Sequence, residues 1–544
     1  MAQAPEMTQH DWWRSAVIYQ IYPRSFQDSN GDGVGDLPGI VARIDYIAAL
    51  GVDAIWVSPF FTSPMADFGY DIADFRDVDP LFGTLADFDG LLAAAHARGI
   101  KVMIDQVLSH TSIEHPWFAE SRRSRDNPKA DWYVWADARP DGSPPNNWLS
   151  IFGGVAWTWD PRRRQYYLHN FLSSQPQLNF HNAEVRAAQL DNLRFWLQRG
   201  VDGFRLDSIN FPYHDAQLRD NPAKPEELRI GRGFSPDNPY AFQYHTYNNT
   251  RPENVLLLED VRRLFDLYPG SVTLGEISSD DSLATMAEYV SPTRLHMAYS
   301  FELLTDDFSA AHIRGTVETL QARMPDGWPC WAVSNHDVRR AVTRWGGDDA
   351  SPAFAKQMVA LVASLRGSVC LYQGEELGLP EADVPFAALQ DPYGKAFWPN
   401  FKGRDGCRTP MPWDDSRDVG FGSATPWLPV PDAHRIRNVS KQEAEPDSPL
   451  QAARAFLHWR RQQPALLHGG IRFLDAPEPV LAFVRTHAEQ SLLVVFNLSD
   501  VAQEWQVPDG MQSEALDVPG VSNGTAAGRR LQLPAHAVWM AMLA

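Results

Sequence analysis

Four short apolar runs in the sequence each end in a carboxylic acid. Asp105 follows the first run, Asp207 the second, Glu276 the third and Asp337 the fourth. Carboxyl groups serve enzymes as nucleophiles and as general acids or bases. A single Asp after a strand is more often the cap of the helix that follows. Four carboxyl groups at four strand ends predict a shared active site, provided that the fold brings those ends together.

The fold expected from the rest of the chain does bring them together. Eight short apolar or β-branched runs alternate with amphipathic stretches, as in parallel strands connected by helices. The expected strands are Ala16–Ile21, Ala54–Val57, Lys101–Val107, Gly203–Leu206, Val272–Leu274, His296–Tyr299, Trp331–Val333 and Val369–Leu371, and the expected helices include Leu37–Leu50, Leu85–Ala97, Ala183–Gln198, Ala310–Met324 and Pro352–Leu365. This count predicts an α/β fold of the (β/α)8 TIM-barrel class, whose active sites lie at the C-terminal ends of the strands. A doubly wound open sheet is the alternative that the count leaves open.

Two long stretches interrupt the alternation, and the pattern changes near the C-terminus. Residues 110–174, after the third strand, and residues 381–448 are rich in Trp, Pro and Asn or Asp and lack a helical period. Loops of this length are usually lids or binding walls. From about Gly469 onward, short alternating runs predict a β-sandwich. We therefore expect a catalytic barrel over residues 1–109 and 175–460, an inserted loop-rich domain over 110–174 and a C-terminal β-sandwich over 461–544.

Composition and charge limit the functions to be considered. The 544 residues include 48 Lys and Arg against 68 Asp and Glu, a formal net charge of −20. Such a chain is a poor partner for nucleic acids or anionic membranes, and it has no apolar run long enough to span a bilayer. Three cysteines are too few for a disulfide framework, and residues 1–10 are unlike a secretory signal. We expect a cytoplasmic monomer or homodimer that binds neither nucleic acid nor membrane.

The segments that carry the carboxyl groups resemble the signature regions of a known enzyme family. They are Asp105 to His110, Gly203 to Asp207, Gly275-Glu276 and Asn335-His336-Asp337. Supporting segments are Tyr19–Phe26, Gly69–Ile72, Gln175–Asn179, Gly374–Gly378 and Arg408–Trp413. On these motifs, which extend over nearly the whole chain, the sequence resembles the α-amylase superfamily (glycoside hydrolase family 13). Within it, the chain is most similar to the α-glucosidase and oligo-1,6-glucosidase branch, in particular to bacterial α-glucosidases that prefer α-1,4 bonds.

This resemblance implies the mechanism of a retaining glycosidase, which uses two carboxyl groups on either side of the scissile bond. Asp207 would be the nucleophile, and Glu276 would be the general acid and then the base, with a pKa raised by burial and by neighbouring carboxylates. Asp337 would hold sugar hydroxyls and favour a distorted sugar ring. Arg205 lies two residues before Asp207 on a strand, so its side chain points to the same side and would keep Asp207 ionised.

The resemblance also implies which groups bind the glucose unit that is cleaved off. His110 and His336 would form hydrogen bonds with its hydroxyl groups, and Tyr70 would be its stacking platform. Phe152 and Phe171 are expected to form further aromatic walls. Aromatic faces suit this task because one side of a sugar ring is apolar.

A charged pair is expected to close the pocket. Asp67 and Arg404 resemble the pair that grips the 4-hydroxyl of the terminal sugar, which would make the pocket blind and restrict cleavage to chain ends. Arg408 lies in the same segment, but we expect Arg404 to be the sugar ligand and Arg408 to be structural. Ser208, directly after the nucleophile, is small, which in this branch accompanies a preference for α-1,4 over α-1,6 bonds.

A metal site is expected in a different loop. Residues 28–36 space oxygen donors like the first part of an EF-hand loop, with ligands at Asp28, Asn30, Asp32, Val34 and Asp36. The twelfth position is Gly39 rather than Glu, so a Gly- and Asp-rich turn without a metal is the alternative. Because relatives keep an ion here, the resemblance implies a structural Ca²⁺ or Mg²⁺. No cofactor is expected for catalysis itself.

The expected function is hydrolysis of α-glucosides from their non-reducing ends. The expected substrates are maltose and short malto-oligosaccharides, with some transfer of glucose to acceptor alcohols. A sucrose hydrolase or a dedicated α-glucosyl transferase of the same superfamily is the alternative, since loop shape decides donor and acceptor preference. Two other classes are disfavoured: transporter subunits of the superfamily typically lack the catalytic carboxylates, and a carbohydrate-binding module would explain only the C-terminal sandwich.

Overall fold

Eight parallel strands form the central sheet of this computed structural model, which describes residues 11–229, 237–488 and 490–544. The strands are β1 (Val17–Ile21), β2 (Ala54–Val57), β5 (Lys101–Val107), β9 (Gly203–Asp207), β10 (Val272–Ile277), β11 (Met297–Ser300), β12 (Cys330–Ala332) and β13 (Ser368–Tyr372). They pair in chain order, and β13 also pairs with β1. A parallel bridge between Ala298 of β11 and Pro329 beside β12 closes the sheet. The expected (β/α)8 barrel is therefore confirmed, and the open sheet is excluded.

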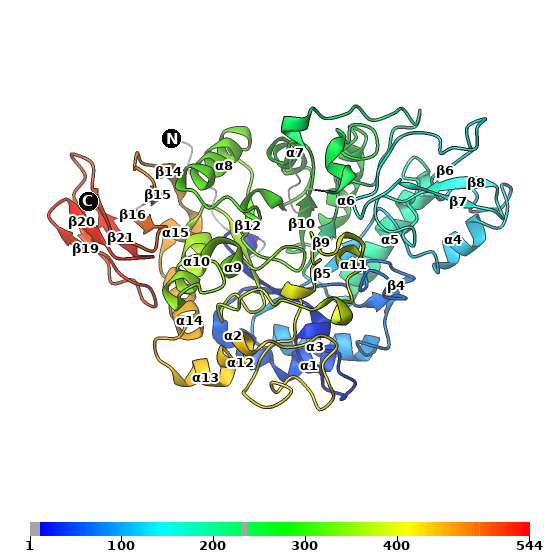
Figure 1. The fold of residues 1–544 in the computed structure, drawn as a ribbon. Helices are drawn as coiled ribbons and strands as arrows, with labels where there is room; N and C mark the ends of the chain where they lie inside the picture. Colours follow the sequence, from blue (N-terminus) through cyan, green and yellow to red (C-terminus); the bar gives the residue numbers. More distant parts are fainter. Residues whose placement is uncertain (1–10, 230–236, 489) are drawn as a thin grey trace.

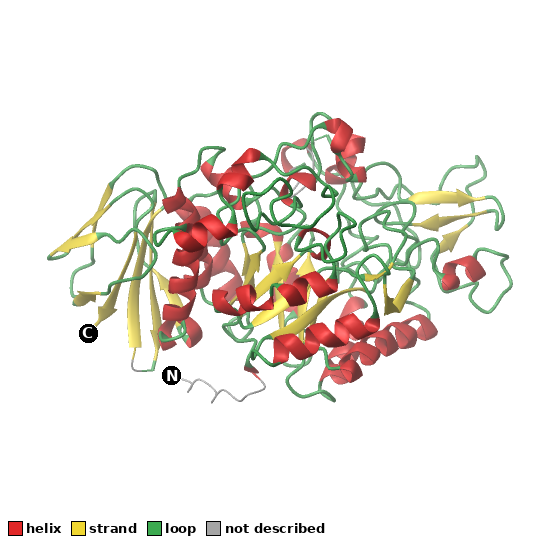
Figure 2. Ribbon diagram, turned by 90° about the horizontal axis from the view of Figure 1, so that it is seen from below, coloured by secondary structure: helices red, strands yellow, loops and turns green. Residues whose placement is uncertain are grey.

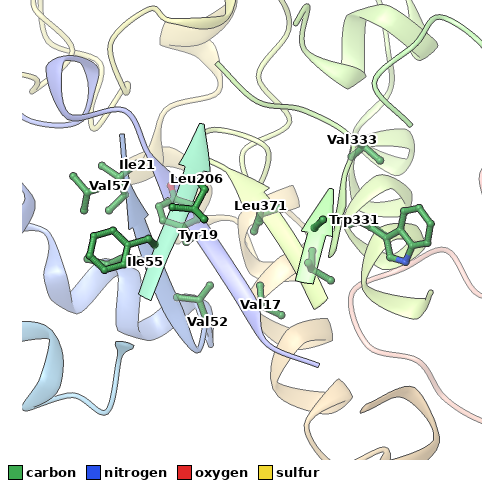
Figure 3. Packing of buried hydrophobic residues seen from close by; sticks show 14 of the residues in the cluster. Val17, Tyr19, Ile21, Val52, Ile55, Val57, Leu206, Trp331, Val333 and Leu371 are labelled. Carbon is green, nitrogen blue, oxygen red and sulfur yellow. The ribbon is translucent and has the colours of Figure 1, made fainter. Parts of the chain in front are cut away.

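Both faces of the barrel strands are buried, and the side chains alternate between two cores. Val17, Tyr19 and Ile21 of β1 point outward into the large core between the strands and the helices, as Figure 3 shows. Ile18 of the same strand and Trp56 of β2 belong instead to the core inside the barrel. Successive side chains of a strand point to opposite faces, and here both faces are buried. These segments are therefore continuous apolar runs in the sequence.

Helices cover the outside of the barrel (Figure 1). They are α1 (Leu37–Ala42), α2 (Ile44–Leu50), α3 (Leu85–His96), α5 (Ala183–Arg199), α6 (Asn254–Phe265), α7 (Ser282–Tyr289), α8 (Ala310–Arg323), α9 (Ala341–Gly346), α10 (Pro352–Ser364) and α14 (Pro449–Arg460). The single helix predicted over Leu37–Leu50 was wrong in one respect, because Arg43 leaves helical geometry and separates α1 from α2. Its guanidinium lies 4.1 Å from the ring centroid of Trp413, which fixes this break against the core.

The segment after the third barrel strand forms a small sheet at one end of the molecule (Figure 1). It contains β6 (Trp135–Ala136), β7 (Trp157–Asp160) and β8 (Gln165–Leu168), which pair in the order β6-β8-β7, together with the short helix α4 (Pro116–Ser121). The strands β3 (Phe61–Thr62) and β4 (Asp74–Val78) form a two-stranded sheet and lie at the two ends of the loop that connects them. The second irregular stretch contains the short helices α11 (Pro392–Phe397), α12 (Asp432–Ile436) and α13 (Val439–Ala444) and the 3-10 helices η6 (Phe386–Ala388) and η7 (Asp405–Cys407). Loops rather than regular elements therefore surround the strand ends.

Antiparallel sheets form the C-terminal part, at the opposite end of the molecule (Figures 1 and 2). After α15 (Pro464–His468), the strands are β14 (Gly470–Phe473), β15 (Val480–His487), β16 (Gln490–Asn497), β17 (Gln503–Gln506), β18 (Ser513–Ala515), β19 (Thr525–Ala527), β20 (Arg530–Leu533) and β21 (Val538–Leu543). They form a five-stranded and a three-stranded sheet that share one apolar core, as expected for a sandwich. Arg485 of β15 donates to five main-chain carbonyls, including that of Ser364 in α10, and so ties this part to the barrel. None of the helices in the described ranges combines the length and the apolar character needed to cross a bilayer.

Candidate active site

A cavity with about 740 Å³ of empty space lies at the C-terminal ends of the barrel strands. Its lining is Asp67, Tyr70, His110, Ile151, Phe152, Phe171, Gln175, Asp207, Ser208, Glu276, Ser278, Phe301, Asp337, Tyr393 and Arg404. Nine of the site residues expected from the sequence are in this set. The two others, Arg205 and His336, are fully buried beneath it. The structure thus gathers all eleven residues at one place.

Arg205 is the centre of the site. Its Nη1 lies 2.8 Å from an oxygen of Asp105 and 2.6 Å from Oδ1 of Asp207, and its Nη2 lies 2.5 Å from Oε1 of Glu276. The guanidinium also lies 5.0 Å from the ring centroid of Trp56, inside the barrel. One buried cation therefore holds carboxyl groups from three successive strands, β5, β9 and β10, in fixed positions.

Negative charge exceeds positive charge around the cavity. Three guanidinium groups, those of Arg205, Arg404 and Arg408, contact six carboxyl groups, those of Asp67, Asp105, Asp207, Glu276, Asp337 and Asp391. Burial raises the pKa of Asp207 and of Glu276 to about 7 each; Arg205 opposes this rise and the neighbouring carboxylates add to it. The two groups therefore share a proton near neutral pH, and the site favours a substrate that becomes positively charged.

Glu276 is held through both of its oxygens. Tyr299 of β11 donates a 3.0 Å hydrogen bond to Oε1, the oxygen that also contacts Arg205. The main-chain N–H of Ser208 donates a 3.0 Å hydrogen bond to Oε2. A carboxyl group positioned in this way can give up or take a proton at one defined place in the cavity.

Asp337 is the carboxylate that stays ionised. Arg404 and Arg408 contact its Oδ1 at 3.1 and 3.0 Å, and Nε2 of His336 lies 3.3 Å from its Oδ2. Burial disfavours the charged form, but these three neighbours outweigh it and hold the pKa of Asp337 well below its usual range. Asp337 is therefore a fixed negative charge and hydrogen-bond acceptor at the cavity wall.

His336 lies behind the cavity wall. Its ring stacks on Tyr70 with a centroid distance of 5.4 Å, and its Nε2 lies 2.6 Å from the Tyr70 hydroxyl. Its Nδ1 lies 2.8 Å from the amide nitrogen of Gln20. The Tyr70 hydroxyl also donates to Asp105 at 3.0 Å, so Tyr70 is locked in place and presents a fixed surface to the cavity. In this structure both nitrogens of His336 are engaged by protein groups.

His110 and two phenylalanines form the opposite wall. Nε2 of His110 lies 3.2 Å from the side-chain nitrogen of Gln175, and its ring centroid lies 5.0 Å from that of Phe171. Burial lowers the pKa of His110 to about 4, so the ring is neutral at pH 7. Phe152 contacts both Phe171 and Tyr393, which extends an aromatic surface across the cavity.

An ion pair lies in the wall of the cavity. Nη2 of Arg404 lies 2.9 Å from Asp67 and 2.8 Å from Asp391. Asp391, which is fully buried, also accepts hydrogen bonds from Nε and from the main-chain N–H of Arg404, so it fixes this arginine from behind. Arg408 binds the carbonyl of His336 at 2.7 Å and is not part of the cavity lining.

Sequence reasoning missed several residues in the lining, and also Asp391 behind it. Asp391 and Tyr393 lie in the irregular stretch, where a helix cap is the only recognisable pattern. Phe301 follows β11 and Ser278 follows β10, so the strand-end argument could have found both. Gln175 lies in a segment that resembles the family and contacts both Asp67 and His110, but no role had been inferred for it.

The loop expected to hold a metal is ordered by its own hydrogen bonds. Asp28 accepts from the main-chain N–H groups of residues 30, 31 and 33, and Asp36 accepts from those of residues 29 and 39. The side-chain nitrogen of Asn30 lies 3.2 Å from Asp32. Among the described residues, no group of three His, Cys, Asp or Glu side chains is arranged to hold a metal. Three of the five expected donors are the Asp side chains of residues 28, 32 and 36, which do not form such a group in this structure. The metal site therefore stays a prediction.

Replacing Asp391 by Asn should weaken sugar binding, because the change removes the charge that fixes Arg404 from behind. We expect the Kd for glucose, measured by isothermal titration calorimetry, to rise about tenfold, the usual scale for one charge-assisted hydrogen bond. Asp383→Asn is the matched control, because Asp383 lies in the same stretch but is exposed and pairs with Lys402. Equal affinities of the Asp391 and Asp383 variants would contradict the positioning of Arg404 by Asp391.

Comparison with known proteins agrees with the geometry of the site. The α-amylase catalytic domain model matches residues 20–469, and the maltogenic amylase C-terminal domain model matches residues 471–539. The chain is 53% identical to a probable α-glucosidase of Rhizobium meliloti, with 98% of this chain and 97% of that protein covered. It is 38% identical to an oligo-1,6-glucosidase of Heyndrickxia coagulans, with 92% and 94% covered.

Solved structures give the same result for the fold. The crystal structure of an α-glucosyl transfer enzyme is similar with a TM-score of 0.97 and 68% identity, covering 98% of this chain and 99% of that one. The trehalulose synthase of Pseudomonas mesoacidophila is similar with a TM-score of 0.90 and 34% identity, covering 99% of this chain and all of that one. The chain belongs to the α-amylase superfamily, glycoside hydrolase family 13, and is a glycoside hydrolase acting on glucosides.

Proposed function

We propose that this enzyme is a retaining, exo-acting α-glucosidase that removes the terminal glucose from maltose and short α-1,4-glucosides. The observation that carries this proposal is the Asp67–Arg404 ion pair, which lies in the wall of the same cavity as Asp207, Glu276 and Asp337. We infer that this pair closes one end of the cavity. A closed end accepts one terminal sugar and leaves no room for a polymer to continue. The glucosidase relatives support the same substrate class.

In the proposed reaction, Asp207 attacks the anomeric carbon of the bound glucose. The bond from that carbon to the glycosidic oxygen breaks, and its electron pair takes the proton from Glu276, so the leaving sugar departs as an alcohol. Glu276, now ionised, removes a proton from water, whose oxygen displaces Asp207 from the glucose. The contact of Arg205 with Asp207 supports this assignment, because the cation favours a charged nucleophile.

The remaining groups would bind and distort the terminal glucose. Asp337 is ionised and partly exposed to the cavity, so it can accept hydrogen bonds from sugar hydroxyls and stabilise positive charge on the ring. His110 faces the same space, and Tyr70 offers an immobile aromatic face. His336 would act by holding Tyr70 and Asp337 in place, unless the sugar displaces its present contacts.

Glucosyl transfer to an acceptor alcohol is the second candidate function. It uses the same intermediate, with an alcohol in place of water. Its support is the 68% identity to a protein described as an α-glucosyl transfer enzyme. Sucrose is a further candidate donor, since the structural relatives include a mutant of a trehalulose synthase whose crystal structure was solved in complex with the substrate sucrose. The small side chain of Ser208 in the lining favours α-1,4 over α-1,6 bonds.

A substrate panel tests this proposal. Initial rates are measured on maltose, isomaltose, sucrose, trehalose and soluble starch, and glucose release and transfer products are followed together. We expect fast release of glucose from maltose and little activity on starch or isomaltose. Strong sucrose cleavage without maltose cleavage would favour the alternative donor. Internal cleavage of starch would contradict the closed end of the cavity.

The pH dependence of kcat/KM should be bell-shaped with a maximum near neutral pH. The reaction needs Asp207 ionised and Glu276 protonated, and burial raises the pKa of both to about 7. On the alkaline side, activity falls as Glu276 loses its proton; on the acid side, it falls as Asp207 gains one. Rates on maltose across pH 4 to 10 in constant-ionic-strength buffers check this, and a rate that stays flat up to pH 9 would contradict the assignment of the acid.

We also propose that the loop of residues 28–36 binds a structural Ca²⁺ or Mg²⁺ through oxygen atoms of Asp28, Asn30, Asp32, Val34 and Asp36. These are the hard oxygen donors that both ions prefer. Removal of the ion with EDTA should lower the Tm by several degrees, because a ligand that binds only the folded state stabilises it. Re-addition of Ca²⁺ should restore the Tm of the wild type but not that of Asp32→Ala. A Tm that is the same in Ca²⁺-loaded and in EDTA-treated protein would contradict this site.

A further inference from the structure

The backbone at Ser208 has an unusual conformation. Ser208 directly follows Asp207 at the end of β9, and its φ is +41°, in the left-handed region. Non-glycine residues adopt this region only where the surroundings fix it, and such positions are frequent at functional sites. Glycine would fit here without strain, so the chain holds a serine in a conformation that serine does not prefer.

The turn at Ser208 is held by the Phe211 N–H, which donates to the Ser208 carbonyl at 2.9 Å, and by contacts with Glu276. The main-chain N–H of Ser208 donates to Oε2 of Glu276 at 3.0 Å, and the next N–H, that of Ile209, donates to the main-chain carbonyl of Glu276 at 3.2 Å. The hydroxyl of Ser208 is 3.5 Å from the same Oε2, a much weaker contact. The left-handed turn thus joins the residue after the nucleophile to the acid on the neighbouring strand.

The hydrogen bonds of Glu276 also show which oxygen carries its proton. Oε1 faces two donors, Arg205 at 2.5 Å and the Tyr299 hydroxyl at 3.0 Å. A proton on Oε1 would oppose both of these donors. The proton therefore lies on Oε2, and this is the oxygen that the Ser208 N–H contacts.

We propose that Ser208 is a positioning residue whose left-handed backbone directs its N–H at Oε2 of Glu276, where it aligns the acid and stabilises the negative charge that appears as the proton leaves. This inference rests on the proposed function of Glu276 as the general acid. It gives Ser208 a role through its backbone, separate from the effect of side-chain size on linkage preference. The physical basis is that a fixed N–H donor aimed at a developing charge stabilises the transition state.

Other charged groups around Glu276 stay in place when residue 208 is changed. The groups that act on it are Arg205 and Asp207 of β9, Asp105 of β5, Tyr299 of β11 and Asp337 after β12. None of them depends on the side chain at position 208 for its contacts with Arg205, Arg404 or Arg408. Asp207 precedes Ser208 directly and also acts on the pKa of Glu276. A shift of the alkaline limb of the pH–rate profile therefore reports the N–H contact where the acid limb, which belongs to Asp207, stays unchanged.

Two substitutions separate the backbone from the side chain. Ser208→Gly removes the hydroxyl but favours the left-handed backbone, whereas Ser208→Thr keeps the hydroxyl and disfavours that backbone through its branched Cβ. Each is tested on maltose, whose leaving alcohol needs the proton, and on 4-nitrophenyl α-glucoside, whose leaving phenolate does not. Circular dichroism and Tm confirm that both variants are folded.

We expect the threonine variant to lose roughly tenfold more activity on maltose than on the nitrophenyl substrate, the scale of one hydrogen bond to a charged group. Its alkaline limb should move to higher pH by roughly half a unit or more, since loss of an N–H donor disfavours the carboxylate. The glycine variant should keep the wild-type ratio of the rates on the two substrates. Its pH dependence of kcat/KM should also have the same alkaline limb as that of the wild type.

Other outcomes would overturn the inference. If the glycine variant shifts the alkaline limb and the threonine variant does not, the hydroxyl and not the backbone acts on Glu276. If the threonine variant slows both substrates equally, residue 208 acts by its size alone. If the threonine variant does not fold, Ser208→Ala takes its place. The proposal would then be contradicted by an alanine variant that keeps the wild-type ratio of the two rates and the wild-type alkaline limb, together with a glycine variant that shifts both. A wild-type enzyme that cleaves neither substrate would refute the proposed function instead, so the two failures are distinguishable.

Discussion

The rest of the active site depends on one buried cation, the guanidinium of Arg205. A buried charge without partners is very costly, and here carboxyl groups from β5, β9 and β10 provide the partners. Because β9 lies between β5 and β10 in the parallel sheet, the ends of all three strands are within reach of its Arg205 side chain. The same contacts determine the chemistry, because the cation contacts both Asp207 and Glu276. Burial and the neighbouring carboxylates raise the pKa of both groups to about 7, so that the pair can hold a proton near neutral pH.

A second group of charges, formed by loops, sets the shape of the cavity. Arg404 and Arg408 come from the irregular stretch after β13, Asp337 follows β12, and Asp67 comes from the loop after β3. In the proposed function, the barrel supplies the reacting groups on rigid strands, and the loops supply the groups that select a terminal sugar. This division explains how relatives with similar folds can include glucosidases, a glucosyl transfer enzyme and a trehalulose synthase.

Much of this architecture could be predicted from the sequence, and particular residues show where prediction stopped. The barrel strands are apolar on both faces, so each was recognisable as a run, and the carboxyl group at its end followed from the fold. The contact of Asp391 with Arg404 could not be predicted, because a loop contact has no period or spacing. The break at Arg43 was missed because packing on Trp413, and not helix propensity, separates α1 from α2. The location of His336 behind Tyr70 likewise depends on tertiary stacking.

The central claim is that Asp207 forms a covalent bond to glucose, while Glu276 donates a proton to the leaving oxygen and then removes one from water. The most direct test is to incubate Glu276→Gln with α-glucosyl fluoride and to locate the label by peptide mass spectrometry. Fluoride leaves without an acid, but the missing base slows hydrolysis of the intermediate, so the intermediate should accumulate. The account predicts one added glucosyl group, on Asp207. A label on another residue, or release of fluoride without any label and with inversion of the anomeric carbon, would contradict it.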